Sequence, residues 1–235
     1  MTDIRVSSAA FTDSREWVPL FDDILYFNLF RGGEKNLDRN LAPGGAAPTV
    51  VGTPTFGTGY ARLTGDVAYL DTGILGSAEM TLISVGRGVG VGSDPDTRPM
   101  FISSFAASTS DDAGASIFGQ NATDTRMSVF RAVAGSLLTQ TLTSTPNNWS
   151  ARSHRWDTVA YVASLTDDVT ASQGLNGAHT PSNNTFRIGA CHTTGFGGQS
   201  DHIMAMIVDR KITDEELDQV YALAQWAAAL DGITV

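Results

Sequence analysis

The sequence predicts an all-β fold, a two-sheet antiparallel sandwich that ends in one C-terminal α-helix. Short apolar segments recur between turn-forming residues along most of the 235-residue chain, and this spacing is typical of antiparallel sandwiches. No segment before Thr213 repeats at helical spacing over three turns, whereas the segment after it does. The apolar fraction of 42% is sufficient for a substantial core. We therefore expect one large β domain.

Residues 1–22 have neither a strand period nor a helix period, and we predict that they form an N-terminal arm or lead-in segment. Phe11 and Trp17 lie in this arm, and large aromatic side chains on an irregular terminus require cover from the chain itself or from a neighbour. We therefore expect these two residues, together with Trp226, to form an assembly interface. Residues 23–235 are expected to form the sandwich domain.

The clearest predicted strand is Ile24–Phe30, because its residues suit a pleated surface and two glycines follow it. The glycine-rich segment Gly86–Gly92 lacks the Lys-Ser/Thr ending of a phosphate-binding loop, so we predict a strand or loop with close backbone contacts. Further strands are predicted where short extended segments lie between turns: Thr49–Val51, Tyr60–Leu63, Val67–Thr72, Met80–Val85, Met100–Phe105, Ala115–Phe118, Met127–Ala132, Leu137–Leu142, Asp157–Ala163 and Thr185–Gly189.

The C-terminal helix is predicted over about residues 213–230. Thr213 and Glu216 have the spacing of a capping box, in which each side chain binds the backbone N–H of the other residue. Gly232 is placed to end the helix in the left-handed conformation. The apolar residues form two neighbouring rows, so we expect one row to meet the sandwich and the other to meet another element or another subunit.

The order of several short phrases resembles the concanavalin A-like lectin/glucanase superfamily in its laminin-G-like form, of the type found in phage structural proteins. The resemblance covers most of residues 24–230 and implies a jelly roll of two sheets packed face to face. The phrases are Val50-Val-Gly-Thr-Pro54, Tyr69-Leu-Asp-Thr-Gly73, Phe186-Arg-Ile-Gly-Ala190, Ile203–Val208 and Asp209-Arg-Lys-Ile-Thr-Asp-Glu-Glu-Leu217.

Charge and cysteine content limit the partners and the location. A net charge of −10 argues against sequence-independent binding to nucleic acid or to anionic membranes, because both require basic patches. The single Cys191 has no partner for an internal disulfide, and no basic-then-apolar leader opens the sequence. We therefore expect a protein made in the cytoplasm of its host, with no nucleic-acid or membrane partner.

The glucanases of the resembled superfamily use paired carboxylates on neighbouring inward-facing positions of one strand, in a Glu-x-Asp-x-Glu arrangement. None of the glutamates of this chain has that spacing. We therefore assign no catalytic residue and expect a protein that is not an enzyme.

Calcium and sugar are the two ligands that the resemblance leaves open. Asp94 and Asp96 lie in a predicted loop and are weak calcium candidates, because no spacing identifies a full set of oxygen ligands. No other cofactor is expected. Sugar recognition uses aromatic faces and a few polar groups, and the best local combination is Trp149 with Arg152 and Arg155.

The function favoured by these observations is a non-enzymatic, virion-associated structural or adhesive protein. It would decorate a capsid or belong to a tail or fibre, form a homo-oligomer, contact other virion proteins and use its lectin-like sandwich on a host glycan. Two alternatives remain: a stand-alone carbohydrate-binding lectin and a glycan hydrolase. A lectin binds free sugar measurably, whereas a hydrolase fails when one specific carboxylate is removed.

Overall fold

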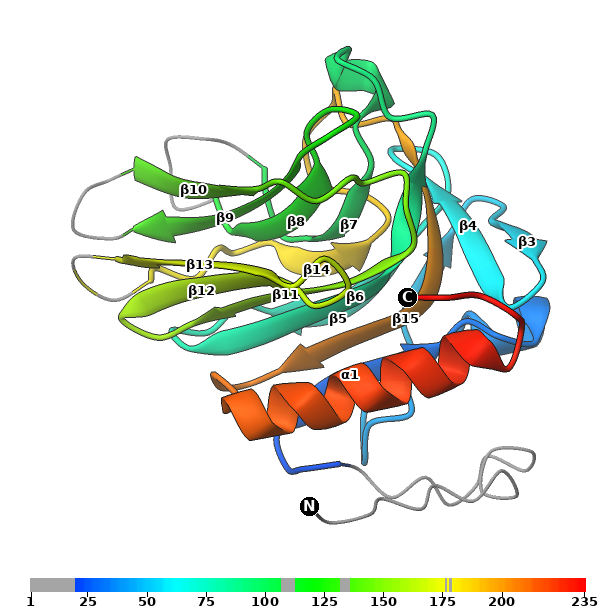
Figure 1. The fold of residues 1–235 in the computed structure, drawn as a ribbon, viewed down its shortest axis with the longest axis horizontal. Coiled ribbons are helices and arrows are strands. Elements are labelled where there is room, and N and C mark those ends of the chain that lie inside the picture. The colour runs from blue at the N-terminus through cyan, green and yellow to red at the C-terminus, as the bar shows by residue number, and fades with distance from the viewer. Residues whose placement is uncertain (1–19, 107–112, 132–135, 176, 178) are drawn as a thin grey trace.

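Two antiparallel β-sheets lie face to face in the computed structural model, and one helix covers the outside of the first sheet (Figure 1). The structure describes residues 20–106, 113–131, 136–175, 177 and 179–235. The predicted interface residues Phe11 and Trp17 lie outside these ranges, as does nearly all of the predicted arm. The expected two-sheet sandwich with a C-terminal helix is confirmed.

The first sheet follows a path of seven strands, and an eighth strand, β1 (Ile24–Leu29), pairs with the fifth of them. Along the path the strands are β13 (Val169–Gly174), β12 (Val159–Ser164), β11 (Ser150–Trp156), β6 (Met80–Val89), β15 (Gln199–Val208), β4 (Tyr60–Thr64) and β3 (Thr55–Gly57). Of these, β3, β11 and β13 were not predicted from the sequence.

The second sheet contains seven strands, all of them predicted. In order they are β10 (Ser136–Leu142), β9 (Thr125–Arg131), β8 (Ala115–Gly119), β7 (Met100–Ser103), β14 (Thr185–Ile188), β5 (Tyr69–Leu75) and β2 (Thr49–Val51). Two short 3-10 helices, η2 (Gly33–Asn36) and η3 (Pro95–Thr97), lie in connections. The core between the sheets is apolar and includes the buried rings of Tyr26, Phe101, Trp156 and Phe186.

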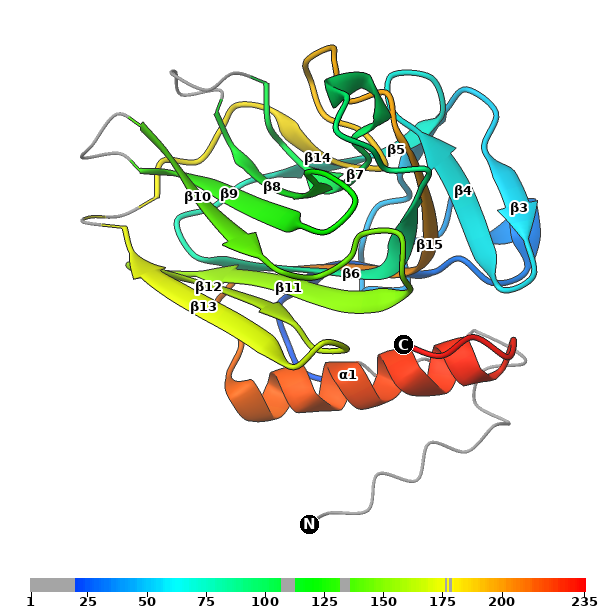
Figure 2. The ribbon, with the colours of Figure 1, turned by 45° about the horizontal axis from the view of Figure 1, so that its top comes forward.

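The helix α1 (Asp214–Ala229) packs against the outer face of the first sheet, as Figure 2 shows. Its capping box is confirmed: Thr213 Oγ1 accepts from the N–H of Glu216 at 3.2 Å, and Glu216 accepts from the N–H of Thr213 at 2.8 Å. Residues of both predicted apolar rows, among them Val220 and Leu223, are buried in one cluster with the first sheet. The wide apolar arc is thus covered largely by the chain itself. No helix in the described ranges is both long enough and apolar enough to cross a membrane.

Strand β15 has two halves with different surroundings. Its second half pairs with β1 and its first half with β4, while β6 pairs with both halves on the other side. A register shift between His202 and Met204 separates the halves, so that Ile203 and Met204 both lie in the cluster under the helix. Beyond this point, toward β4, polar and aromatic side chains replace the apolar cluster on the outer face.

The glycine-rich segment behaves as predicted, as a strand with close backbone contacts. Gly86 and Gly88 lie in β6, and a Cβ atom on Gly86 would overlap the carbonyl oxygen of Asp201 on β15. Glycine at this position therefore permits the two central strands to approach each other.

Candidate functional site

The structure places the two arginines of the predicted sugar site away from the surface. Arg152 lies on β11 and is completely buried between the sheets. Its Nη1 donates to the carbonyl oxygen of Gly86 at 3.0 Å, and its guanidinium carbon lies 4.9 Å from the centre of the Phe101 ring. Burial lowers the pKa of Arg152 to about 10. The prediction that Arg152 binds sugar at the surface is therefore wrong, because its side chain lies in the core.

Arg155 lies on the other face of β11, where it joins the sheet to the beginning of α1. It donates to the carbonyl oxygen of Ile212 at 3.0 Å and to the carboxylate of Asp214 at 2.7 Å, and it is 8% exposed. Arg155 is thus a structural link and does not lie beside Trp149. The basic segment was not predicted as a strand, because charged residues rarely occupy a buried strand inside a sheet.

Trp149 is partly exposed and lies just before β11, next to a different set of residues. The centre of its ring is 5.3 Å from that of Tyr60, and the ring planes are inclined at 59°. The guanidinium carbon of Arg87 lies 4.6 Å from the centre of the Trp149 ring and 5.9 Å from that of Tyr60. Two aromatic rings and one guanidinium group therefore share this surface.

Three directly paired residues form a charged row across the same surface. Asp201 on β15 is paired in register with Arg62 on β4 and with Arg87 on β6. Arg62 donates to the two carboxylate oxygens of Asp201 at 2.6 and 3.0 Å, and Arg87 Nε donates to one of them at 3.0 Å. The hydrogen bonds to Asp201 raise the pKa of Arg62 above its ordinary value. The carboxylate is fully buried beneath two arginines that remain about one-third exposed.

Two glycines of the β3–β4 hairpin position the aromatic part of the surface. A Cβ atom on Gly57 would overlap the Tyr60 ring, so glycine leaves room for that ring to lie across β3. Gly59 has a φ of +79°, and a Cβ atom there would lie 2.5 Å from Asp231. Asp231 follows α1 and is bound by Arg31 at 2.6 Å, which anchors the end of the helix beside the hairpin.

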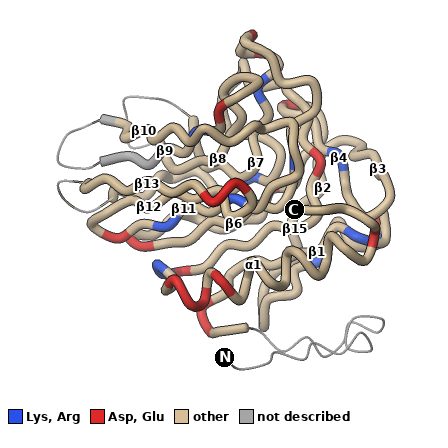
Figure 3. Tube along the Cα trace, in the orientation of Figure 1, with Lys and Arg blue, Asp and Glu red and all other residues tan. Residues whose placement is uncertain are grey.

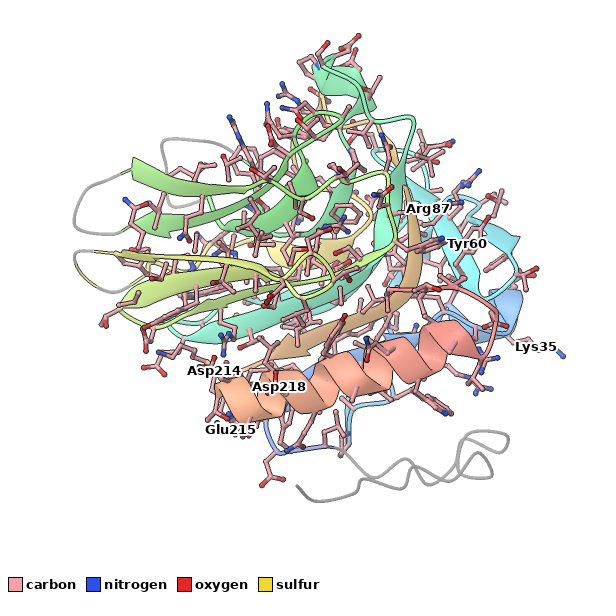
Figure 4. All side chains as sticks on the ribbon, viewed as in Figure 1. Lys35, Tyr60, Arg87, Asp214, Glu215 and Asp218 are labelled. Atoms are coloured by element: carbon pink, nitrogen blue, oxygen red, sulfur yellow. The ribbon has the colours of Figure 1, made fainter. Side chains whose placement is uncertain are left out.

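We call Tyr60, Arg62, Arg87 and Trp149, with the buried Asp201, the aromatic–arginine platform. In Figure 4 the side chains of Tyr60 and Arg87 lie close together near β4 and β15, at the opposite end of the molecule from the acidic first turn of α1. The platform offers flat ring faces and guanidinium donors on an outer surface. This combination suits binding of a ligand that has both an apolar face and polar groups.

Asp94, one of the two calcium candidates, has a structural role in its loop. Asp94 caps η3 by accepting from the backbone N–H of Asp96 at 3.0 Å. Among the described residues, no group of three or more His, Cys, Asp or Glu side chains is arranged to hold a metal ion.

Most of the platform was missed from the sequence. The alternation of Tyr60 and Arg62 in a predicted strand does indicate that both side chains lie on one face. Their approach to Arg87 and Asp201, however, depends on pairings between strands that are distant in the sequence.

Comparisons with known proteins show a shared fold. No protein-family model and no curated protein matches the chain. Among solved structures, it is similar to the botulinum neurotoxin type G receptor binding domain, with 13% identity over 86% of this chain and 52% of that chain and a TM-score of 0.62. The binding domain of botulinum neurotoxin DC in complex with SialylT gives 10% identity, 87% and 52% coverage and a TM-score of 0.64. The binding domain of Paraclostridial Mosquitocidal Protein 1 gives 10% identity, 86% and 52% coverage and a TM-score of 0.61.

The chain thus spans about half the length of these solved structures. At such low identity the likeness shows the β-sandwich fold and nothing more specific. The laminin-G-like assignment and the phage type remain predictions.

Proposed function

We propose that this chain is a non-enzymatic, glycan-binding module and that the aromatic–arginine platform holds the saccharide. The observation that carries the proposal is the pair of aromatic rings, Tyr60 and Trp149, whose centres lie 5.3 Å apart beside Arg87 on an outer face of the sandwich. Aromatic faces cover the apolar side of a sugar ring, while charged donors bind its oxygen atoms. Both kinds of contact are available within this one surface.

The names of the similar structures support a binding role on this fold. The type G domain is described as receptor binding, and the DC domain was solved in complex with SialylT. These descriptions belong to those proteins, and a binding role for this chain is our proposal. The sugar site we infer for this chain rests on its own platform residues.

A glycan array probed with the purified full chain tests the proposal. We expect the array to identify binding glycans and Tyr60→Ala to weaken binding to them by about tenfold, because one stacking face is lost. Tyr161→Ala is the matched control, since Tyr161 also lies on the first sheet, beside Lys211 and Arg155. It pairs with Arg155 at the end of β11, whereas Trp149 lies before the beginning of that strand. Equal binding by both variants, or no binding by the parent chain, contradicts the proposal.

We further propose that the module is carried on a virion as a capsid-decorating, tail or fibre protein and that it forms a homo-oligomer. The support is the resemblance to laminin-G-like jelly rolls of phage structural proteins, together with Leu230, which is 43% exposed one helical turn after Trp226. Light scattering with and without calcium tests the assembly. A discrete oligomer that calcium does not change supports the proposal, whereas a monomer contradicts it.

A further inference from the structure

We propose that the saccharide bound by the platform is acidic and that its carboxylate pairs with Arg87. This inference rests on the proposed glycan-binding function and specifies the class of glycan. It is carried by the charge balance of the platform and by the hydrogen-bonding groups that Arg87 leaves available.

The platform has one positive charge in excess. Two guanidinium groups, those of Arg62 and Arg87, share the single carboxylate of Asp201, and arginine stays protonated at all ordinary pH values. The second negative charge that would balance the group is absent among the described residues of the platform. An anionic ligand supplies that charge.

Arg87 has guanidinium N–H groups that do not bind Asp201. Only its Nε donates to Asp201, whereas both Nε and Nη2 of Arg62 donate to that carboxylate. Within the described ranges, Nη1 and Nη2 of Arg87 have no hydrogen-bond partner, and the side chain is 34% exposed. Two adjacent N–H groups on a planar guanidinium match the two oxygens of a carboxylate.

The guanidinium of Arg87 is also held in place before any ligand arrives. It stacks on Trp149 at 4.6 Å while Asp201 fixes its Nε at 3.0 Å. A side chain that is already ordered loses less conformational entropy on binding. The ring faces beside it then contact the sugar while the guanidinium binds the acid group.

Among the described residues, Asp201 is the one carboxylate that forms an ion pair with Arg62 or Arg87. Figure 3 shows acidic residues gathered at the first turn of α1, which contains Asp214, Glu215 and Glu216, and Figure 4 places that turn at the far end from Arg87. Asp231, which touches Gly59 of the hairpin, is already bound by Arg31.

Titration calorimetry of the full chain with 3′-sialyllactose, a glucuronate-terminated disaccharide and neutral lactose tests the inference. We expect an acidic sugar to bind about tenfold or more tightly than lactose. This difference in affinity should shrink as the salt concentration is raised from about 50 to about 500 mM, because salt screens exposed ion pairs in this range. The two acidic probes distinguish a sialic acid from a uronic acid as the source of the carboxylate.

Arg87→Gln should remove the preference for the acidic sugar, so that the variant binds the acidic sugar and lactose with equal affinity. Lys35→Gln removes the same charge from an exposed side chain that points away from the platform (Figure 4) and should keep the acidic preference. If Arg87→Gln does not fold, the salt dependence of the parent chain still tests the preference for an acidic sugar.

Equal affinity for lactose and the acidic sugars, lost in Tyr60→Ala, overturns the acidic preference and leaves the glycan-binding function standing. Retention of the acidic preference in a folded Arg87→Gln variant overturns the assignment of Arg87. Binding of none of the probes, together with a blank glycan array, overturns both proposals.

Discussion

The guanidinium group of Arg87 is stacked against the ring of Trp149, with 4.6 Å between the guanidinium carbon and the ring centre. Arg87 lies on β6, whereas Trp149 precedes β11, so the contact joins neighbouring strands of the first sheet across its outer face. The stacking and the hydrogen bond to Asp201 together fix the direction in which the remaining donors of Arg87 point. This relationship makes the surface a preorganised site in our account.

Replacing Gly57 should change binding more than stability. A Cβ atom on Gly57 overlaps the Tyr60 ring, so Gly57→Ala displaces that ring from the platform. We expect a loss of glycan affinity of about three- to tenfold and little change in the thermal midpoint, because β3 is a short edge strand. Gly92→Ala is the control, since its Cβ meets only Thr97 at 3.5 Å. A Gly57→Ala variant with unaltered affinity shows that the ring position does not matter.

Asp201→Asn should destabilise the protein. The fully buried carboxylate is the shared partner of Arg62 and Arg87, and its loss leaves an amide that cannot satisfy both guanidinium groups. Because both arginines retain contact with water, we expect a loss of unfolding free energy on the order of 2 kcal/mol. Urea denaturation measures it.

Asp231→Asn is the comparison for that experiment. It breaks the more exposed pair with Arg31 and should cost below about 1 kcal/mol. A cost for Asp201→Asn no larger than that for Asp231→Asn contradicts the structural role given to the buried carboxylate.

Stability should fall as the pH is lowered through the weakly acidic range. Burial lowers the pKa of His154 to about 3 and that of His202 to about 4, whereas a histidine in the unfolded chain has a pKa of about 6.5. Below about pH 6.5 these two imidazoles therefore bind protons in the unfolded chain but stay neutral in the folded chain. The contribution is fully present above pH 6.5 and is lost progressively down to about pH 4 for His202 and about pH 3 for His154.

Each histidine contributes a slope on the order of 1 kcal/mol per pH unit in that range. Chemical denaturation in steps of about half a pH unit, from about pH 7.5 to about pH 5, measures this slope of the unfolding free energy. His154→Phe removes one titrating group and should flatten the profile. An unchanged slope in that variant assigns the pH dependence to other groups.

Thr213→Ala should weaken the beginning of α1. The side chain of Thr213 accepts from Glu216 at 3.2 Å and closes the capping box, so its removal should cost about 1 kcal/mol in unfolding free energy. Thr213→Ser keeps the hydroxyl and should stay within about 0.5 kcal/mol of the parent chain. Equal losses in the two variants exclude the cap as the cause.

The local parts of the fold were predictable from the sequence. Alternating apolar residues such as those of Tyr60–Leu63 identify a half-buried strand, and the spacing of Thr213 and Glu216 identifies the beginning of the helix. Strand β11 was not predictable in this way, because its interior positions carry Arg152 and His154 where apolar residues are expected.

The candidate site was predictable only in one residue, Trp149. Arg62 and Arg87 meet Asp201 across separations of 139 and 114 residues. These contacts follow from the register of β4 and β6 against β15, which no local pattern specifies. The sequence thus indicated Trp149 beside Arg152 and Arg155, whereas in the structure Trp149 lies beside Arg87 and the other two arginines are buried.

The binding role of the platform is best tested by the affinity of Trp149→Ala for the glycan that the parent chain binds most tightly. Trp149 supplies one aromatic ring and supports Arg87. We therefore expect the affinity to fall by about tenfold or more, which is the loss typical of removing one aromatic anchor. Circular dichroism should show that the variant is folded. A folded Trp149→Ala variant that binds the glycan as tightly as the parent chain contradicts a binding role for the platform.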